Sequence, residues 1–195
     1  RDVTGVQTCA LPIYGTNVVE AFLAFLRDVQ TADYVAGQNV IQFDTPMMTS
    51  NLTRIGLDNE CLIKKPHIDS YYDLNLHSKM KPKSLSYFAL DHGYVNFGAH
   101  QAMNDVFACA HILSKYTLQS TIAISSTPLI EVITQNSYGN KDRKDLLYSM
   151  GFRWNAEFKT YNKILREFFM PTLTEKLDAL NKHQIFPIDR KSTRL

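Results

Sequence analysis

The sequence has few cysteines, no long apolar run and little excess charge. Its three cysteines, Cys9, Cys61 and Cys109, are far apart and form no Cys-x-x-Cys pair, which argues against a disulfide scaffold and a structural zinc site. No apolar run approaches the ~20 residues that span a bilayer. The 21 Lys and Arg against 19 Asp and Glu leave a net charge of +2, too small to indicate a protein that coats nucleic acid. We therefore expect a soluble protein of a reducing compartment, the cytoplasm, with no membrane contact.

What the chain does have is ordinary globular composition. It has 195 residues, of which 45% are hydrophobic and 21% charged. This is enough apolar mass for one domain, or for one domain with an appendage. Helical and strand-like segments alternate along the chain, and this pattern predicts an α/β or α+β fold.

The two ends of the chain do not fit this pattern. Residues 1–13 (RDVTGVQTCALPI) have no initiating Met and no helical or strand period, and residues 189–195 (DRKSTRL) end the chain with a cluster of charge. Both segments resemble translated read-through of sequencing adapters, as found in metagenomic assemblies, so we expect a reading frame interrupted on both sides. The alternative is a pair of real, disordered tails. In either case we leave both segments out of the expected fold.

Apolar periodicity predicts the elements between these ends. Residues 17–29 form one amphipathic helix with Asn17 as its N-cap. Residues 33–44 (DYVAGQNVIQFD) predict a buried strand that breaks at Gly37, and Pro46 then opens a helix that ends near Gly56. Further elements are a strand that turns into a helix at 67–79, helices at 84–94 and 99–116, a strand at 130–138, a short helix at 139–152, an aromatic hairpin at 152–165 and a helix at 172–185.

Asp44 is expected at the end of the buried strand, over a polar turn. A carboxylate in that place can ligate a hard divalent cation. It can equally well cap the helix that begins near Pro46. Asp69, at the end of the His67-Ile68-Asp69 run, allows the same two interpretations, and there we favour the cap.

His100 and Asp105 stand at the front of the helix expected over 99–116. On an ideal helix they lie about 140° apart, so both can face one site only if His100 precedes the first turn. A metal-held Asp beside a mobile His suits phosphodiester hydrolysis, because the metal acidifies a water molecule and the His accepts its proton. The spacing by itself fits an exposed His and a solvated Asp better.

Taken in order, these segments resemble the DEDDh 3′-to-5′ exonucleases, the family of the epsilon proofreading subunit of bacterial DNA polymerase III. The second motif of that family reads roughly HNxxFD and its third motif AHxAxxDxxA. Gln101 stands where a Tyr-type relative has Tyr, which favours the His type. The residues that match are Asn39, Phe43 and Asp44 in the second motif and Ala99, His100, Ala102 and Asp105 in the third.

This resemblance covers about residues 17–116. It implies an α/β, RNase H-like exonuclease domain over 14–118, lacking its first strands, with a small α+β appendage over 119–188. It implies hydrolysis of single-stranded DNA, or less readily RNA, from the 3′ end with two Mg²⁺ or Mn²⁺ ions, in DNA replication or repair and with a DNA polymerase as partner. The implied roles are Asp44 and Asp105 as metal ligands, His100 as general base, and Gln38, Asn39 and Phe43 as the turn under the substrate.

The chain departs from the family pattern at two places. Gln38 stands where the family usually has His. The first motif, an Asp-x-Glu pair that holds both metals, has no counterpart in residues 1–38. We therefore expect an N-terminally truncated exonuclease that is inactive as this fragment. The alternative is a non-catalytic module that kept the fold and binds nucleic acid or docks to a polymerase, and an upstream Asp-x-Glu distinguishes the two.

Residues 151–163 combine aromatic and basic side chains, and they are similar to a short element behind some phage and bacterial exonucleases. Such a segment can stack bases and contact phosphates, but a small core with basic side chains at its rim fits as well. We expect Trp154 to be packed, with Arg153, Lys159 and Lys163 on the outer face. In the last helix, Leu173, Leu177 and Leu180 share one face.

Overall fold

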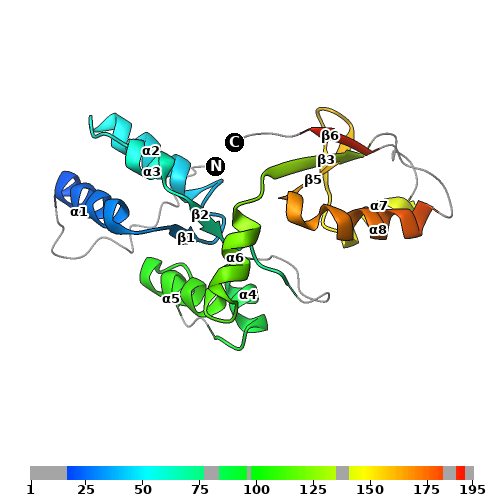
Figure 1. Cartoon of the computed structure of the whole chain (residues 1–195), viewed down its shortest axis with the longest axis horizontal. Helices are drawn as coiled ribbons and strands as arrows, with labels where there is room; N and C mark the ends of the chain where they lie inside the picture. Colours follow the sequence, from blue (N-terminus) through cyan, green and yellow to red (C-terminus); the bar gives the residue numbers. More distant parts are fainter. Residues whose placement is uncertain (1–16, 77–83, 96–97, 135–140, 182–187, 192–195) are drawn as a thin grey trace. The chain divides into compact units, whose positions relative to one another are not determined.

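The computed structural model describes residues 17–76, 84–95, 98–134, 141–181 and 188–191. The chain divides into two compact units, residues 1–122 and 123–195, and each is described by itself (Figure 1). The sequence predicts the division after residue 118. It falls after residue 122, inside helix α6 (Leu118–Ser125).

The first unit is built on a small parallel sheet. Strands β1 (Val35–Gly37) and β2 (His67–Asp69) pair in parallel, with Gly37 opposite Asp69. Parallel neighbours need a crossover connection, which here contains helices α2 (Asp44–Arg54) and α3 (Glu60–Lys64). The other helices of this unit are α1 (Val18–Thr31), α4 (Leu85–Asp91) and α5 (Ala102–Leu113).

Helix α1 forms where the apolar period predicts it. The Asn17 side-chain oxygen accepts a hydrogen bond of 2.9 Å from the Val19 backbone N–H and so caps the helix. On its inner face, Leu26 and Val29 are buried in one cluster with Leu52 of α2 and Leu62 of α3. This cluster, against which the first strand also packs, holds the crossover in place.

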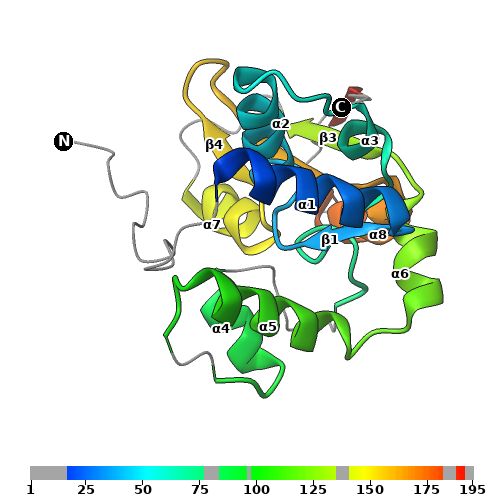
Figure 2. The same ribbon diagram turned by 90° about the vertical axis from the view of Figure 1, so that its left-hand side faces the viewer.

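Helices α4 and α5 lie side by side in both views (Figures 1 and 2). Near the contact between α4 and α5, two groups hold the His92 ring. Its Nδ1 lies 2.6 Å from the Phe88 carbonyl oxygen, and its Nε2 lies 2.7 Å from the Tyr116 hydroxyl. His92 therefore fixes the end of α4 against the end of α5. The buried side chains between the helices are Leu74, Phe88, Ala89, Ala108 and Ile112.

The second unit is a four-stranded antiparallel sheet in the order β4-β5-β3-β6, with two helices. Its chain order, β-α-β-β-α-β, is that of the ferredoxin-like, split β-α-β motif. The elements are β3 (Leu129–Thr134), α7 (Lys141–Ser149), β4 (Arg153–Asn155), β5 (Thr160–Arg166), the 3₁₀ helix η2 (Glu167–Phe169), α8 (Met170–Asn181) and β6 (Ile188–Lys191).

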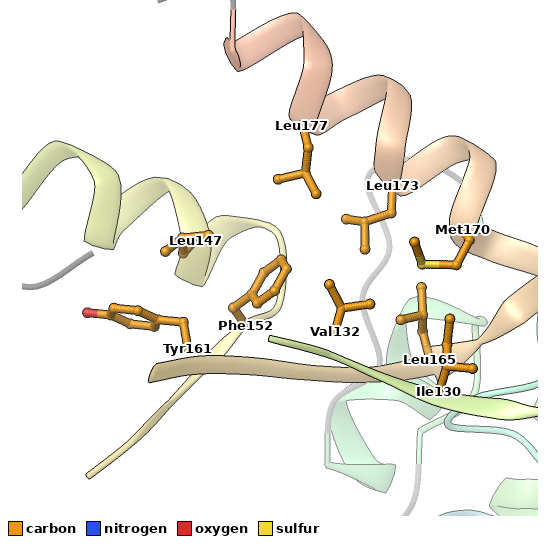
Figure 3. Close-up of a cluster of buried hydrophobic side chains, with 9 residues drawn as sticks. All are labelled: Ile130, Val132, Leu147, Phe152, Tyr161, Leu165, Met170, Leu173 and Leu177. Carbon is orange, nitrogen blue, oxygen red and sulfur yellow. The ribbon is translucent and has the colours of Figure 1, made fainter. Parts of the chain in front are cut away.

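Helices α7 and α8 cover the same face of this sheet (Figure 3). Leu173 and Leu177 point from α8 toward the strands, as the sequence predicts, while the Leu180 side chain lies outside the described residues. The strands contribute alternate residues, because successive side chains of a strand point to opposite faces. The cluster consists of Ile130, Val132, Leu147, Phe152, Tyr161, Leu165, Met170, Leu173 and Leu177.

Two expectations about the course of the chain need correction. The segment after β2 is a turn, not a helix, as far as it is described. Residues 189–191, which the sequence leaves outside the fold, belong to β6, where Asp189 lies opposite Ile133 of β3. The backbone of β3 has hydrogen-bonding groups on both edges, and β6 pairs with the edge that β5 leaves open. Residues 1–13 and 192–195 lie outside the described residues.

The described chain is thus a mixed α/β protein with small sheets. In the described ranges, no helix has the length and apolar character needed to cross a membrane.

Candidate functional site

A tight turn, residues 38–43, follows strand β1 and leads to the candidate metal ligand Asp44. The sequence predicts a buried strand that breaks at Gly37; β1 does end at Gly37, but it is only partly buried. Asn39 has a φ of 59°, a left-handed conformation that ends a strand. Gly37 allows the turn to close tightly, since a Cβ at this position would lie 2.8 Å from the Val40 Cβ.

Asp69 holds this turn from the neighbouring strand. Its fully buried carboxylate accepts backbone hydrogen bonds from Asn39 at 2.7 Å, Ile41 at 3.2 Å and Tyr71 at 2.9 Å. Burial raises the pKa of Asp69 to about 6, although these three N–H donors favour the charged form. Asp69 therefore accepts backbone N–H groups as a capping residue does. These N–H groups belong to turns, however, and not to the first turn of a helix.

Asp44 is the first residue of α2 and not its cap. The cap position belongs to Phe43, whose side chain makes no capping hydrogen bond and is 61% exposed. The Asp44 carboxylate is half-buried, and the loss of water around it raises its pKa. A carboxylate that is costly to ionise in this way is stabilised by a bound cation.

His100 precedes helix α5, which begins at Ala102. This is the arrangement that lets His100 and Asp105 face one site. His100 is exposed with a φ of 73°, and its backbone N–H lies 3.3 Å from the Asp105 Oδ1 that accepts it. The entry to α5 is further fixed by Asn104, whose side-chain amide donates to the Gly98 carbonyl at 3.2 Å. A residue in a sparsely populated conformation before a helix is a frequent feature of functional sites.

The inner face of α5, which carries Cys109, approaches the end of β2. Cys109 follows Asp105 by four residues, so the two side chains share one face of the helix. The Cys109 sulfur lies 4.0 Å from the Ser70 hydroxyl, directly after β2. Burial, together with the negative charges of Asp69 and Asp44, raises the pKa of Cys109 to about 11. Both motif segments thus approach the carboxyl ends of β1 and β2.

Other residues implied in substrate contact lie on the same turn. The Gln38 side-chain oxygen is 3.4 Å from the Ser70 hydroxyl that donates to it. Gln38 and Asn39 are half-buried, whereas Phe43 is exposed. Within the described residues, no three His, Cys, Asp or Glu side chains come close enough together to hold a metal ion. The resemblance itself assigns only two ligands, Asp44 and Asp105, to this chain.

Sequence reasoning missed three contributors to this site: Ser70, Cys109 and the hold of Asp69 on the turn. One signal was present: Asp69, like Asp44, follows a segment predicted as a strand, and the carboxyl ends of parallel strands meet at one edge of a sheet. Cys109 carries no such signal, since a lone cysteine on a helix is most often a small buried side chain.

The aromatic and basic segment forms the β4–β5 hairpin of the second unit. Trp154 is half-buried, its ring 4.9 Å from that of Tyr161. Arg153 and Lys159 are exposed, as expected, but Lys163 is not available on the outer face. Its ammonium group donates to the Met150 carbonyl at 2.6 Å, because strand alternation turns Lys163 to the same side as Tyr161.

Comparison with known proteins found no relative of this chain. No protein-family model matches the chain, and neither a curated protein nor a solved structure matches it.

Proposed function

We propose that the first unit belongs to a 3′-to-5′ exonuclease of the DEDDh type with an RNase H-like fold, acting on single-stranded DNA more readily than on RNA. The observation that carries the proposal is the approach of two motif segments that are far apart in the sequence. Asp44 starts α2 at the end of the 38–43 turn, and α5 turns the face of Asp105 and Cys109 toward the same strand ends. A polymerase partner belongs to the same proposal and rests on the resemblance alone, whereas a cytoplasmic location is proposed from the few cysteines and the lack of a long apolar run in the sequence.

In the proposed site, Asp44 and Asp105 would hold Mg²⁺ or Mn²⁺, and the bound ion would supply a more acidic water and partial neutralisation of the phosphate charge. His100 would accept the proton of the attacking water. Its exposed position before α5 allows the ring to reach a substrate without moving the helix. Phe43 is exposed beside Asp44 and is available to stack on a terminal base.

The complete reaction needs an Asp-x-Glu pair that residues 1–38 do not contain. We propose that a chain with this pair is the active enzyme. The present chain, with two of the four carboxylates, binds the metal weakly, because Mg²⁺ gives up its water reluctantly for an incomplete site.

The direct test is Mn²⁺ binding, followed by the paramagnetic resonance signal of free Mn²⁺. The unaltered chain is expected to bind Mn²⁺ weakly, and Asp44→Asn and Asp105→Asn are each expected to remove most of that binding. Asp33→Asn, which changes an exposed carboxylate between α1 and β1, is the matched control and should bind as the unaltered chain does.

The proposal fails if the Asp44 and Asp105 variants, folded as judged by circular dichroism, bind Mn²⁺ like the control. Binding of single-stranded DNA without any dependence on these carboxylates would instead support the non-catalytic module.

A further inference from the structure

We infer that Asp69 is the positioning residue of the candidate site: its buried carboxylate fixes the 38–43 turn and thereby the place of Asp44. The part of this inference that concerns metal binding rests on the function proposed above.

Asp69, the last residue of β2, is hydrogen-bonded to the 38–43 turn. Asp69 is far from the turn in sequence, yet its two carboxylate oxygens accept the N–H groups of Asn39 at 2.7 Å and Ile41 at 3.2 Å. Asn39 has a φ of 59°, a conformation that persists only where surrounding contacts impose it. The Asp69 carboxylate is a contact from outside the turn that favours this conformation.

Two backbone hydrogen bonds connect the 38–43 turn to the residues on either side of Asp44. The Asn39 carbonyl accepts the Phe43 N–H at 2.9 Å, and the Val40 carbonyl accepts the Thr45 N–H at 2.9 Å. These two bonds flank Asp44 on either side. The Thr45 hydroxyl also lies 2.8 Å from His67 Nε2. Strand β2 therefore holds the segment around Asp44 at both ends, through Asp69 and through His67.

The hydrogen bonds at position 69 require a carboxylate. Three N–H donors converge on Asp69, and each of its two oxygens accepts at least one of them. A carboxamide offers one acceptor oxygen and one NH₂ donor. An asparagine side chain at position 69 would point its NH₂ donor at a backbone N–H, which is also a donor. Neither group would then have an acceptor, and unpaired donors are costly in a buried site.

Asp73 provides a matched control. It is as fully buried as Asp69 and sits four residues further along the same loop. Its Oδ2 accepts the Asp69 backbone N–H at 2.7 Å. The variant Asp73→Asn therefore perturbs a buried carboxylate of this loop without changing the group that holds Asn39 and Ile41.

The experiment measures amide hydrogen exchange by NMR on the full chain for Asp69→Asn and Asp73→Asn, together with Mn²⁺ affinity. Asp69→Asn should speed exchange of the Phe43 and Thr45 amides by about tenfold or more relative to Leu52 in the core of α2. It should also weaken Mn²⁺ binding by about tenfold or more, as loss of a residue that orients a ligand does. Asp73→Asn should change neither ratio.

A uniform increase of exchange across the unit would overturn the inference, since it would show a general effect on stability. Equal exchange at Phe43 and Thr45 with and without the Asp69 carboxylate would overturn it too, as would the same local change in Asp73→Asn. If the unaltered chain and Asp44→Asn bind Mn²⁺ equally, the proposed metal site fails, while the exchange data still decide whether Asp69 positions the turn.

Discussion

At the scale of single residues, burial governs how the carboxylates near the turn ionise. Asp44 and Asp69 both have a raised pKa, and in each the largest cause is the loss of water around the charge. For Asp69 this effect outweighs three backbone hydrogen bonds to the charged form. The folded protein therefore binds a proton at Asp69 more readily than the unfolded chain does.

This difference predicts an unusual pH dependence of stability. Asp69 has a pKa of about 6 in the fold against an ordinary value of 3.8. Its contribution to stability is therefore fully present below about pH 4 and is lost as the pH rises through 6. The shift corresponds to at most about 3 kcal/mol. Urea unfolding between pH 4 and 7 should show the unaltered chain gaining stability relative to Asp69→Asn as the pH falls.

Comparison with the variant is needed because other groups titrate in the same range. Burial lowers the pKa of His67, so His67 favours the unfolded chain as the pH falls, whereas Asp44 acts in the same direction as Asp69. Subtracting the Asp69→Asn curve removes the part of both contributions that the two chains share. A difference that stays constant, or that grows with rising pH, would contradict the assignment for Asp69.

Cys109 should be the slower of the two described cysteines to react with a thiol reagent. Its pKa of about 11 and its burial leave little thiolate near neutral pH, whereas Cys61 is half-buried. Alkylation of the native chain, followed by peptide mass mapping, should label Cys61 first. Rapid labelling of Cys109 without unfolding would show that α5 opens away from β2.

At the scale of elements, the sequence predicted most helices and strands but neither α3 nor α6. The apolar period located α1 and α5, and Gly56 and Gly93 follow α2 and α4 with positive φ angles. Strand β1 ends at Gly37, where the sequence predicts the break, and contacts from Asp69, which no local pattern contains, hold the turn that follows. Long-range hydrogen bonds thus decided the course of the turn after the strand.

The β4–β5 hairpin gives a prediction at this scale. Trp154 packs on Tyr161 and against the core of the second unit. Trp154→Ala should therefore destabilise the protein by about 1–3 kcal/mol, less than for a fully buried Trp. Binding of single-stranded DNA should change little. Thermal melting and a fluorescence binding titration at low salt measure the two effects.

Lys159→Glu is the counterpart of this variant. Lys159 is exposed in the hairpin loop. A reversed charge there should weaken the binding of single-stranded DNA and reduce the salt dependence of that binding. The free energy of unfolding should change by about 0.5 kcal/mol or less. If Trp154→Ala removed binding at low salt and left melting unchanged, the hairpin would be a base-stacking element.

At the scale of the whole molecule, the proposed activity depends on carboxylates that this chain does not hold. We therefore expect the chain to leave a 5′-labelled single strand intact in a gel assay with Mn²⁺, because two ligands cannot fix two metal ions. Trimming from the 3′ end that is lost in His100→Ala would refute the expectation of inactivity while supporting the role of His100.

The sequence by itself determined the mixed α/β class and the places of most helices and strands, α1 and α5 among them. These follow from local causes: apolar period, glycines and helix geometry. Only the tertiary structure decided that Asp69 holds the turn before Asp44, that Cys109 lies against Ser70, that Lys163 binds Met150 and that residues 188–191 add a strand to the second sheet. Each of these depends on groups far apart in the chain, and no local pattern records which distant hydrogen-bonding partner a buried polar group will find.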